Sequence, residues 1–205
     1  MESRKKLRFV TVVAVYTLAS IMYFLPVPLP HKVALPMFLL TVLSFGQVPC
    51  IMSLAFLFSF LGDLAGSYHS GGNEIPFLLQ MVGFAVAHVL MSVNFLKAGH
   101  GRGRMALCLA ASSAVAISAM LLIVPDTPTG AVRIGTIVYI LVISLMMASA
   151  LKTERLLTSA GAVLFVASDY ILAWSSFVGS IPGSGYLILV PYFLAQILIF
   201  CGETR

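Results

Sequence analysis

Charged residues are scarce in this chain. Only 9% of its 205 residues are Asp, Glu, Lys or Arg, whereas 60% are hydrophobic and the mean hydropathy is +1.05. Soluble domains carry about 25% charged residues, so this chain has too few polar side chains to cover a water-soluble globule. The composition excludes a soluble enzyme, a disordered tail and a nucleic-acid-binding module. It predicts a membrane protein that crosses the bilayer several times.

Cysteine is also rare, and long polar linkers are missing. The three cysteines lie in apolar stretches without the spacing of metal ligands, and their odd number argues against a disulfide framework. We expect neither a metal nor another cofactor. The net charge is +5, but the basic residues occur in short gaps between apolar runs, so we expect no nucleic-acid partner. Without a long linker, residues 1–205 are expected to form a single transmembrane helical domain.

Apolar runs separated by Gly and Pro predict an all-α fold, a single bundle of eight transmembrane helices. A hydrocarbon core about 30 Å thick needs roughly 20 apolar residues per helix. The second run is the shortest and nearly meets the third, but charge counting favours keeping it. The expected spans are residues 9–25, 33–48, 49–66, 75–96, 105–124, 131–151, 156–178 and 185–200.

The topology follows from the distribution of positive charge. With eight spans, both termini are cytosolic, and all but two of the twelve Lys and Arg residues, Lys32 and Arg133, lie on the cytosolic side. The first run follows basic residues as a signal peptide would, but the prolines at 26, 28 and 30 offer no cleavage site. We therefore expect a retained first span in a multi-pass protein of a bacterial inner or cell membrane.

Two acidic side chains and one histidine fall inside expected spans. Asp63 lies in the third span, Asp169 in the seventh and His88 in the fourth. An ionisable group at such depth costs on the order of 3 kcal/mol by insertion scales, and it marks a functional site by default. A structural alternative stays open. Both Asp residues would also be tolerated as capping or pairing groups in the bundle, and His88 as a hydrogen-bonded core residue.

The helical rise brings further polar side chains to a similar depth. At 1.5 Å per residue, Asp63 and Asp169 lie about 20 Å from the cytosolic edge. Tyr139 and Tyr192, on spans of opposite direction, reach that layer, and Gln196 lies one or two turns nearer the cytosol, as does the histidine. We predict that these side chains converge on one polar layer. Either tyrosine would also fit as an interfacial belt residue.

Helical periodicity and a faint repeat extend this set. Gln80 shares a helix face with the histidine, and Ser59 precedes Asp63 by one turn. Asp63 and His88 are 25 residues apart. Asp169, which follows Ser168, and Gln196 are separated by a similar interval of 27 residues. The eight spans would then form two halves of four spans each, related as a parallel repeat about an axis along the membrane normal.

These residues resemble the motifs of a known family, the YhhN-type lysoplasmalogenases. The resemblance covers roughly residues 35 to 202, and its segments occur in the family's order and spacing. Tyr139 also lies where the family tends to have a tyrosine. The matching segments are Ala55-x-x-Phe58-Ser59-x-x-Gly62-Asp63, Gly83-Phe84-x-x-Ala87-His88, Gly161-Ala162-x-x-Phe165-x-x-Ser168-Asp169-x-x-Leu172-Ala173 and Tyr192-x-x-Ala195-Gln196.

The resemblance implies an integral membrane hydrolase that cleaves the vinyl-ether bond of a lysophospholipid, a lysoplasmalogen, to a fatty aldehyde and a glycerophospho-head-group. Such a bond is cleaved by protonating its β-carbon and capturing the resulting oxocarbenium-like cation with water, a task suited to two carboxyl groups in different environments. We expect one of Asp63 and Asp169 to donate the proton and the other to stabilise the cation, with His88 as a proton shuttle or head-group contact. The residues expected to bind substrate are Ser59, Gln80, Tyr139, Ser168, Tyr192 and Gln196.

A different class of function stays open. A small proton-coupled transporter or lipid-binding membrane protein would use the same intramembrane acids as binding groups. Against this alternative, we expect no Gly or Pro interruption at the centre of a span. A purely structural membrane component is a third interpretation, and it would leave both intramembrane acids without a purpose. The surrounding membrane lipids are the only partners expected besides substrate.

Overall fold

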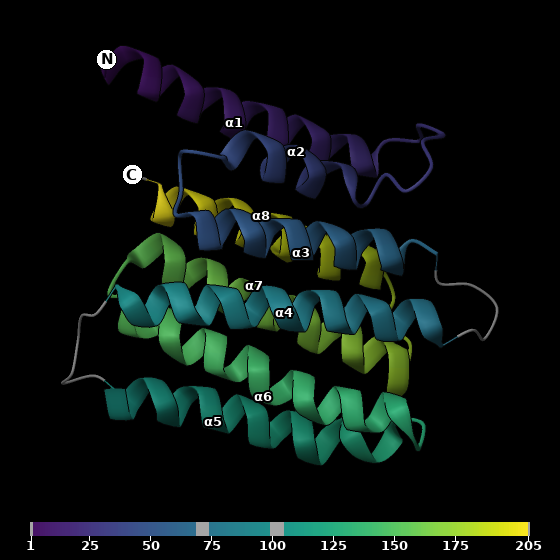
Figure 1. Ribbon diagram of the computed structural model, residues 1–205. Coiled ribbons are helices and arrows are strands. Elements are labelled where there is room, and N and C mark those ends of the chain that lie inside the picture. Colours follow the sequence, from purple (N-terminus) through teal and green to yellow (C-terminus); the bar gives the residue numbers. More distant parts are fainter. Residues whose placement is uncertain (1, 69–73, 99–104, 205) are drawn as a thin grey trace. The chain divides into compact units, whose positions relative to one another are not determined.

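The computed structural model describes residues 2–68, 74–98 and 105–204, and within these ranges every regular element is helical (Figure 1). The predicted all-α fold is confirmed. Arg102 and Arg104, which contribute to the predicted topology, lie outside the described residues. The elements are α1 (Glu2–Phe24), α2 (Leu35–Ser44), α3 (Cys50–Gly66), α4 (Ile75–Lys97), α5 (Met105–Leu122), the short 3₁₀ helix η2 (Val124–Asp126), α6 (Ala131–Lys152), α7 (Leu156–Phe177) and α8 (Ser184–Glu203).

Six helices in the described part of the chain are long and apolar enough to cross a membrane, namely α1, α4, α5, α6, α7 and α8. Each has at least 18 residues, which corresponds to about 27 Å of axial length, close to the thickness of the hydrocarbon core. A helix pairs its backbone N–H and C=O groups within the segment, as hydrocarbon requires. The chain is therefore a multi-pass membrane protein.

The second and third apolar runs form shorter helices. α2 has 10 residues and α3 has 17, about 15 and 25 Å in length. The chain leaves α2 at Phe45, whose ψ of 127° is not helical, Gly46 follows with a left-handed φ of +76°, and Pro49 is the N-cap residue of α3. The second helix is thus shorter than the expected span of residues 33–48. The eight-span count and the cytosolic location of both termini stay predictions.

The chain divides into two compact units. The N-terminal unit comprises Met1–Ala87 with Thr204–Arg205, and the C-terminal unit comprises His88–Glu203, so the boundary falls inside α4. In the N-terminal unit, α1 packs on α2 and α2 packs on α3. The core of this unit includes Tyr16, Met37 and Phe56, all at most 1% exposed. A single domain over the whole chain stays a prediction.

Two glycines allow α3 and α4 to approach closely within the N-terminal unit. A Cβ atom built on Gly83 would lie 2.9 Å from the Cα of Gly62 and 3.1 Å from the carbonyl oxygen of Phe58. Helices in membranes associate where small residues let their backbones meet. The contact places α4 directly against the turn of α3 that carries Asp63.

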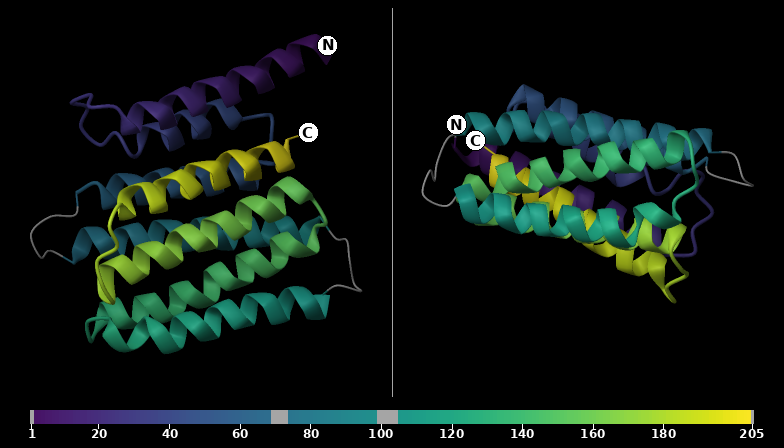
Figure 2. Two further views of the ribbon diagram at one scale, coloured as in Figure 1. Left: turned by 180° about the vertical axis from the view of Figure 1, so that it is seen from behind. Right: turned by 90° about the horizontal axis from the view of Figure 1, so that it is seen from below.

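The most extensive helix pair of the C-terminal unit is α7 with α8, which run side by side (Figures 1 and 2). A Cβ atom on Gly161 would lie 2.8 Å from the carbonyl oxygen of Ala195, and one on Gly202 would lie 2.8 Å from the backbone nitrogen of Thr158. Two glycines therefore allow this contact. Pro191 lies inside α8, and the helix continues through it from Ser184 to Glu203.

Candidate active site

Three side chains predicted from the sequence meet inside the C-terminal unit. The Tyr139 hydroxyl on α6 donates a short hydrogen bond to the Asp169 carboxylate on α7. His88 on α4 lies 3.1 Å, Nε2 to Oη, from Tyr139 and 3.9 Å, Nε2 to Oδ2, from Asp169. Asp169 is 13 residues from the start of α7 and 8 from its end, or about 20 and 12 Å. The cluster lies well within the spanning helices.

The hydrogen-bond directions fix the order of donors in this cluster. The hydroxyl of Tyr139 has one proton, and that proton is donated to Asp169. Its oxygen must therefore accept from His88, which assigns a proton to Nε2 of the imidazole. The result is a directed chain that runs from the His88 N–H through the Tyr139 O–H to the Asp169 carboxylate. Such a chain can relay a proton.

Aromatic rings enclose the histidine. The His88 side chain is fully buried, and the ring of Phe165 packs edge-on against it with 4.6 Å between centroids. The same Phe165 ring also packs edge-on against Tyr192, which is 3% exposed, with 5.4 Å between ring centroids. The Asp169 side chain keeps 14% of its surface exposed. The imidazole is thus shielded, whereas the carboxyl group at the end of the chain is accessible.

Two further predicted residues lie on the α7–α8 pair. The Ser168 hydroxyl donates to the carbonyl oxygen of Ile188 at 2.7 Å, so it ties α7 to the backbone of α8 three residues before Pro191. Gln196 is fully buried, and neither atom of its amide group has a hydrogen-bond partner among the described residues. A buried amide without partners costs about 1–3 kcal/mol and calls for a functional explanation.

The remaining predicted residues belong to the N-terminal unit. Asp63 is 5% exposed and lies within electrostatic range of the Tyr16 hydroxyl on α1. Ser59, one turn before Asp63, is fully buried, and its hydroxyl has no hydrogen-bond partner in the described ranges. The Gln80 side chain lies over Gly66 of α3, where a Cβ atom would come within 2.6 Å of its amide carbon. That Asp63 and Asp169 serve one pocket stays a prediction.

Sequence analysis missed a second polar cluster, at the end of α8. The Glu203 carboxylate is 3% exposed and accepts hydrogen bonds from Asn94 (2.8 Å), Arg155 (2.8 Å) and Thr158 (2.9 Å). The sequence contains one signal for it, because Asn94 is a polar residue inside the apolar run of α4. Glu203 itself resembles an ordinary terminal charge. The cluster joins the ends of α4, α7 and α8.

A metal centre would need several ligands in one place. No group of three His, Cys, Asp or Glu side chains gathers in this way in residues 2–68, 74–98 and 105–204. In the described part of the candidate site, only two side chains of these types, His88 and Asp169, lie together, and Tyr139 forms a hydrogen bond with each of them.

Fold and cluster together define an α-helical multi-pass membrane protein with a buried histidine–tyrosine–aspartate chain. Residues 28–202 match the model of the YhhN family. This match covers most of the chain, and the protein belongs to that family. The family is associated with hydrolase activity. No curated protein and no solved structure matches the chain.

Proposed function

We propose that this protein is a lysoplasmalogenase, which hydrolyses the vinyl-ether bond of a lysoplasmalogen within the membrane. The observation that carries the proposal is the buried hydrogen-bonded chain from His88 through Tyr139 to Asp169. Vinyl-ether hydrolysis begins with a proton transfer to carbon, which needs a positioned acid and a route to replace its proton. Membership of the YhhN family supports the same reaction class.

In the proposed mechanism, Asp169 in its protonated form delivers the proton to the β-carbon of the vinyl ether. The C=C electron pair takes up this proton, and an oxocarbenium ion forms at the α-carbon. Water adds to the α-carbon and loses a proton, giving a hemiacetal that collapses to the fatty aldehyde and the glycerol hydroxyl. Asp169 regains its proton from Tyr139, which takes one from the Nε2–H of His88, and the imidazole is restored by the proton that the attacking water released.

The second carboxylate and the groups that orient water are proposed on separate grounds. Asp63 is assigned the stabilisation of the cation, because the sequence places it at the depth of Asp169 within its own helix. Gln196 is assigned to water or the substrate glycerol, since its buried amide has no hydrogen-bond partner in the described part of the chain. Ser168 acts by positioning, because its hydroxyl bonds Ile188 and so fixes α7 against α8.

The direct test uses the purified full-length protein in detergent with lysoplasmenyl-ethanolamine as substrate. We expect release of one fatty aldehyde per lipid consumed, measured by mass spectrometry. The matched control is the 1-acyl lysophospholipid with the same head group and chain length, which has an ester in place of the vinyl ether and should give no aldehyde. Absence of aldehyde from the folded protein with the vinyl-ether lipid would refute the proposal.

The relay can be tested at its middle member. Replacing Tyr139 by Phe keeps the ring beside His88 but removes the hydroxyl that links the imidazole to Asp169. We expect turnover to fall by about a hundredfold, the low end of what a positioned proton-transfer group contributes. Tyr186→Phe, on the 62% exposed Tyr186, is the matched control and should leave turnover unchanged. Equal turnover of both variants would contradict the relay.

One observation favours the transporter alternative. Pro191 lies inside α8, where it has no backbone N–H to donate, and Gly or Pro within a spanning helix is a feature of substrate sites in secondary transporters. The two functions separate in proteoliposomes loaded with lysolipid. Proton-dependent lipid movement without any aldehyde formation would favour transport, and aldehyde formation without a proton gradient would favour the hydrolase.

A further inference from the structure

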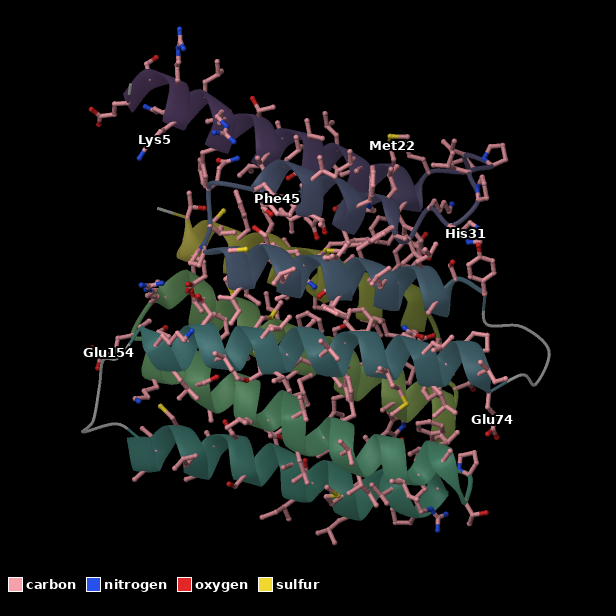
Figure 3. The ribbon with its side chains drawn as sticks, viewed as in Figure 1. Lys5, Met22, His31, Phe45, Glu74 and Glu154 are labelled. Atoms are coloured by element: carbon pink, nitrogen blue, oxygen red, sulfur yellow. The ribbon has the colours of Figure 1, made fainter. Side chains whose placement is uncertain are left out.

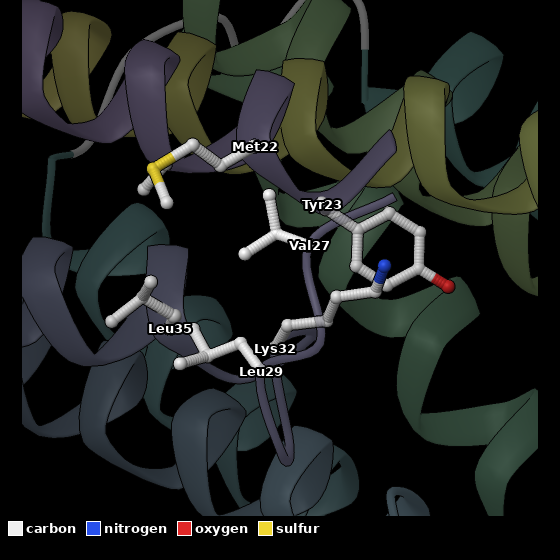
Figure 4. A pocket seen from close by; sticks show the side chains of 7 residues that line it. Met22, Tyr23, Val27, Leu29, Lys32 and Leu35 are labelled. Carbon is white, nitrogen blue, oxygen red and sulfur yellow. The ribbon is translucent and has the colours of Figure 1, made fainter. Parts of the chain in front are cut away.

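A small, partly open hollow lies within the N-terminal unit, where the chain turns from α1 into α2 (Figure 4). Its walls are the apolar side chains of Met22, Val27, Leu29 and Leu35, and the ammonium group of Lys32 lies at one end. The Lys32 Nζ is 5.3 Å from the centre of the Tyr23 ring, a cation–π distance. A single positive charge thus sits at the edge of an apolar hollow.

Lys32 keeps hydrogen-bonding capacity for a ligand. Its ammonium group has three N–H donors, and one of them bonds the carbonyl oxygen of Leu25 at 3.2 Å. The salt bridges of the described residues do not include Lys32. The ammonium group at the end of the pocket therefore has further donors besides the one bonded to Leu25, and no carboxylate forms a salt bridge with it among the described residues. This arrangement fits an anionic oxygen.

The loop that presents Lys32 is restrained at both ends. Prolines at positions 26, 28 and 30 alternate with the pocket residues Val27 and Leu29, and each proline ring fixes φ near −65°. His31, next to Lys32, adopts a left-handed φ of 51°. Its Nδ1 lies 2.6 Å from the Ser67 hydroxyl, and its ring packs on that of Tyr68 at 4.3 Å. These contacts fix the position of the loop next to Lys32.

The polarity of the pocket follows the axis of α1. Figure 3 shows Lys5 at one end of this helix and Met22 near the other, so Tyr23 and Lys32 lie where the apolar run of α1 ends. Tyr and Lys are favoured at the boundary between hydrocarbon and head groups. Ala19, which also lines the pocket, is four residues deeper, or about 6 Å along the axis. A charge beside the end of the apolar run, with Ala19 and Met22 further along the helix toward its middle, matches the layout of a membrane lipid.

We propose that this pocket binds a phospholipid, with the phosphate group on the Lys32 ammonium and the upper part of an acyl chain against Met22, Val27 and Leu29. A free phosphate ion would make no use of the apolar walls, and an uncharged lipid would offer the ammonium no anionic partner. The lipid is bound as a ligand and undergoes no reaction here. The inference is independent of the proposed hydrolase activity.

The experiment measures lipid binding to the purified protein by native mass spectrometry in detergent. Phosphatidylglycerol is the probe, and a diacylglycerol with the same chains is the uncharged comparison. We expect Lys32→Ala to weaken phosphatidylglycerol binding about tenfold, the usual effect of losing one charge-assisted contact. Lys32→Arg, which keeps the charge, should stay within about threefold of the parent protein, and diacylglycerol should bind about tenfold more weakly.

Lys5→Ala is the matched control, because it removes the same charge from the other end of α1 and should leave binding unchanged. Val27→Trp fills the apolar part of the pocket and keeps Lys32, and it should also weaken lipid binding. It therefore tests the proposal independently of whether Lys32→Ala folds. Unchanged binding by Val27→Trp and by folded Lys32→Ala would overturn the proposal. So would an equal loss in Lys5→Ala, which indicates unspecific attraction, or equal competition by millimolar inorganic phosphate, which indicates a soluble anion as the ligand.

Discussion

Aldehyde release is expected to stop when Asp169 is replaced by Asn. The amide has nearly the shape of the carboxyl group, and its oxygen still accepts the hydrogen bond from Tyr139. It has no proton to give to the β-carbon, so the acid of the proposed reaction is lost while the packing of α6 and α7 stays. A general acid contributes about a hundredfold to ten-thousandfold to a rate. Turnover of lysoplasmenyl-ethanolamine should fall by that factor.

The same change in two other acids makes this result interpretable. Asp63→Asn should reduce turnover to a similar extent if Asp63 stabilises the cation. Asp126→Asn alters an exposed residue of η2 and should have no effect. Thermal unfolding in detergent shows whether each variant remains folded. Wild-type turnover in both intramembrane variants would exclude the carboxylate mechanism, and loss in Asp169→Asn alone would exclude the role of Asp63.

The largest effect on stability is expected at Glu203. Replacing it by Ala removes the acceptor of three hydrogen bonds and leaves the Asn94 amide buried without its carboxylate partner. Breaking a buried ion pair costs about 3–5 kcal/mol, and we expect the low end because the Arg155 side chain is 42% exposed. For a chain of this size, a loss of about 3 kcal/mol lowers the unfolding temperature by about 6–12 °C.

Thermal unfolding of the purified protein measures this shift. Glu74→Ala, at an exposed position before α4, is the matched control and should change the unfolding temperature little. Arg155→Ala should cost less than Glu203→Ala, because Asn94 and Thr158 still bond the carboxylate in that variant. An unfolding temperature of Glu203→Ala equal to that of Glu74→Ala would show that the cluster does not hold the helix ends together.

Much of the fold is readable from local sequence. Gly and Pro end the apolar runs, and the helices α4, α6 and α7 begin at the predicted residues. The rise of a helix predicted that Tyr139 and Asp169 lie at one depth, and the structure places them in contact. These predictions succeed because they depend on residues close in the chain and on a rise that tertiary packing does not change.

What the sequence did not reveal depends on how helices rotate against each other. The side-chain depth of Ser168 is predictable, but its bond to Ile188 depends on which face of α7 meets α8. Glu203 resembles a terminal charge until three helix ends bring donors to it. The second run was recognised as the shortest, but the end of α2 at Ser44 was not, because it depends on the extended backbone of Phe45 and the left-handed backbone of Gly46 and not on hydropathy.

The close approach of α7 and α8 limits how this chain can vary. A methyl group at position 161 would meet the backbone of Ala195 and the side chain of Ile199, and one at position 202 would meet the backbone of Thr158. A main chain cannot move aside as a flexible side chain does, so the obstacle persists whatever surrounds it. Related chains that preserve this helix pair are therefore expected to retain glycine at both places, while the lipid-facing positions between them drift freely among apolar residues.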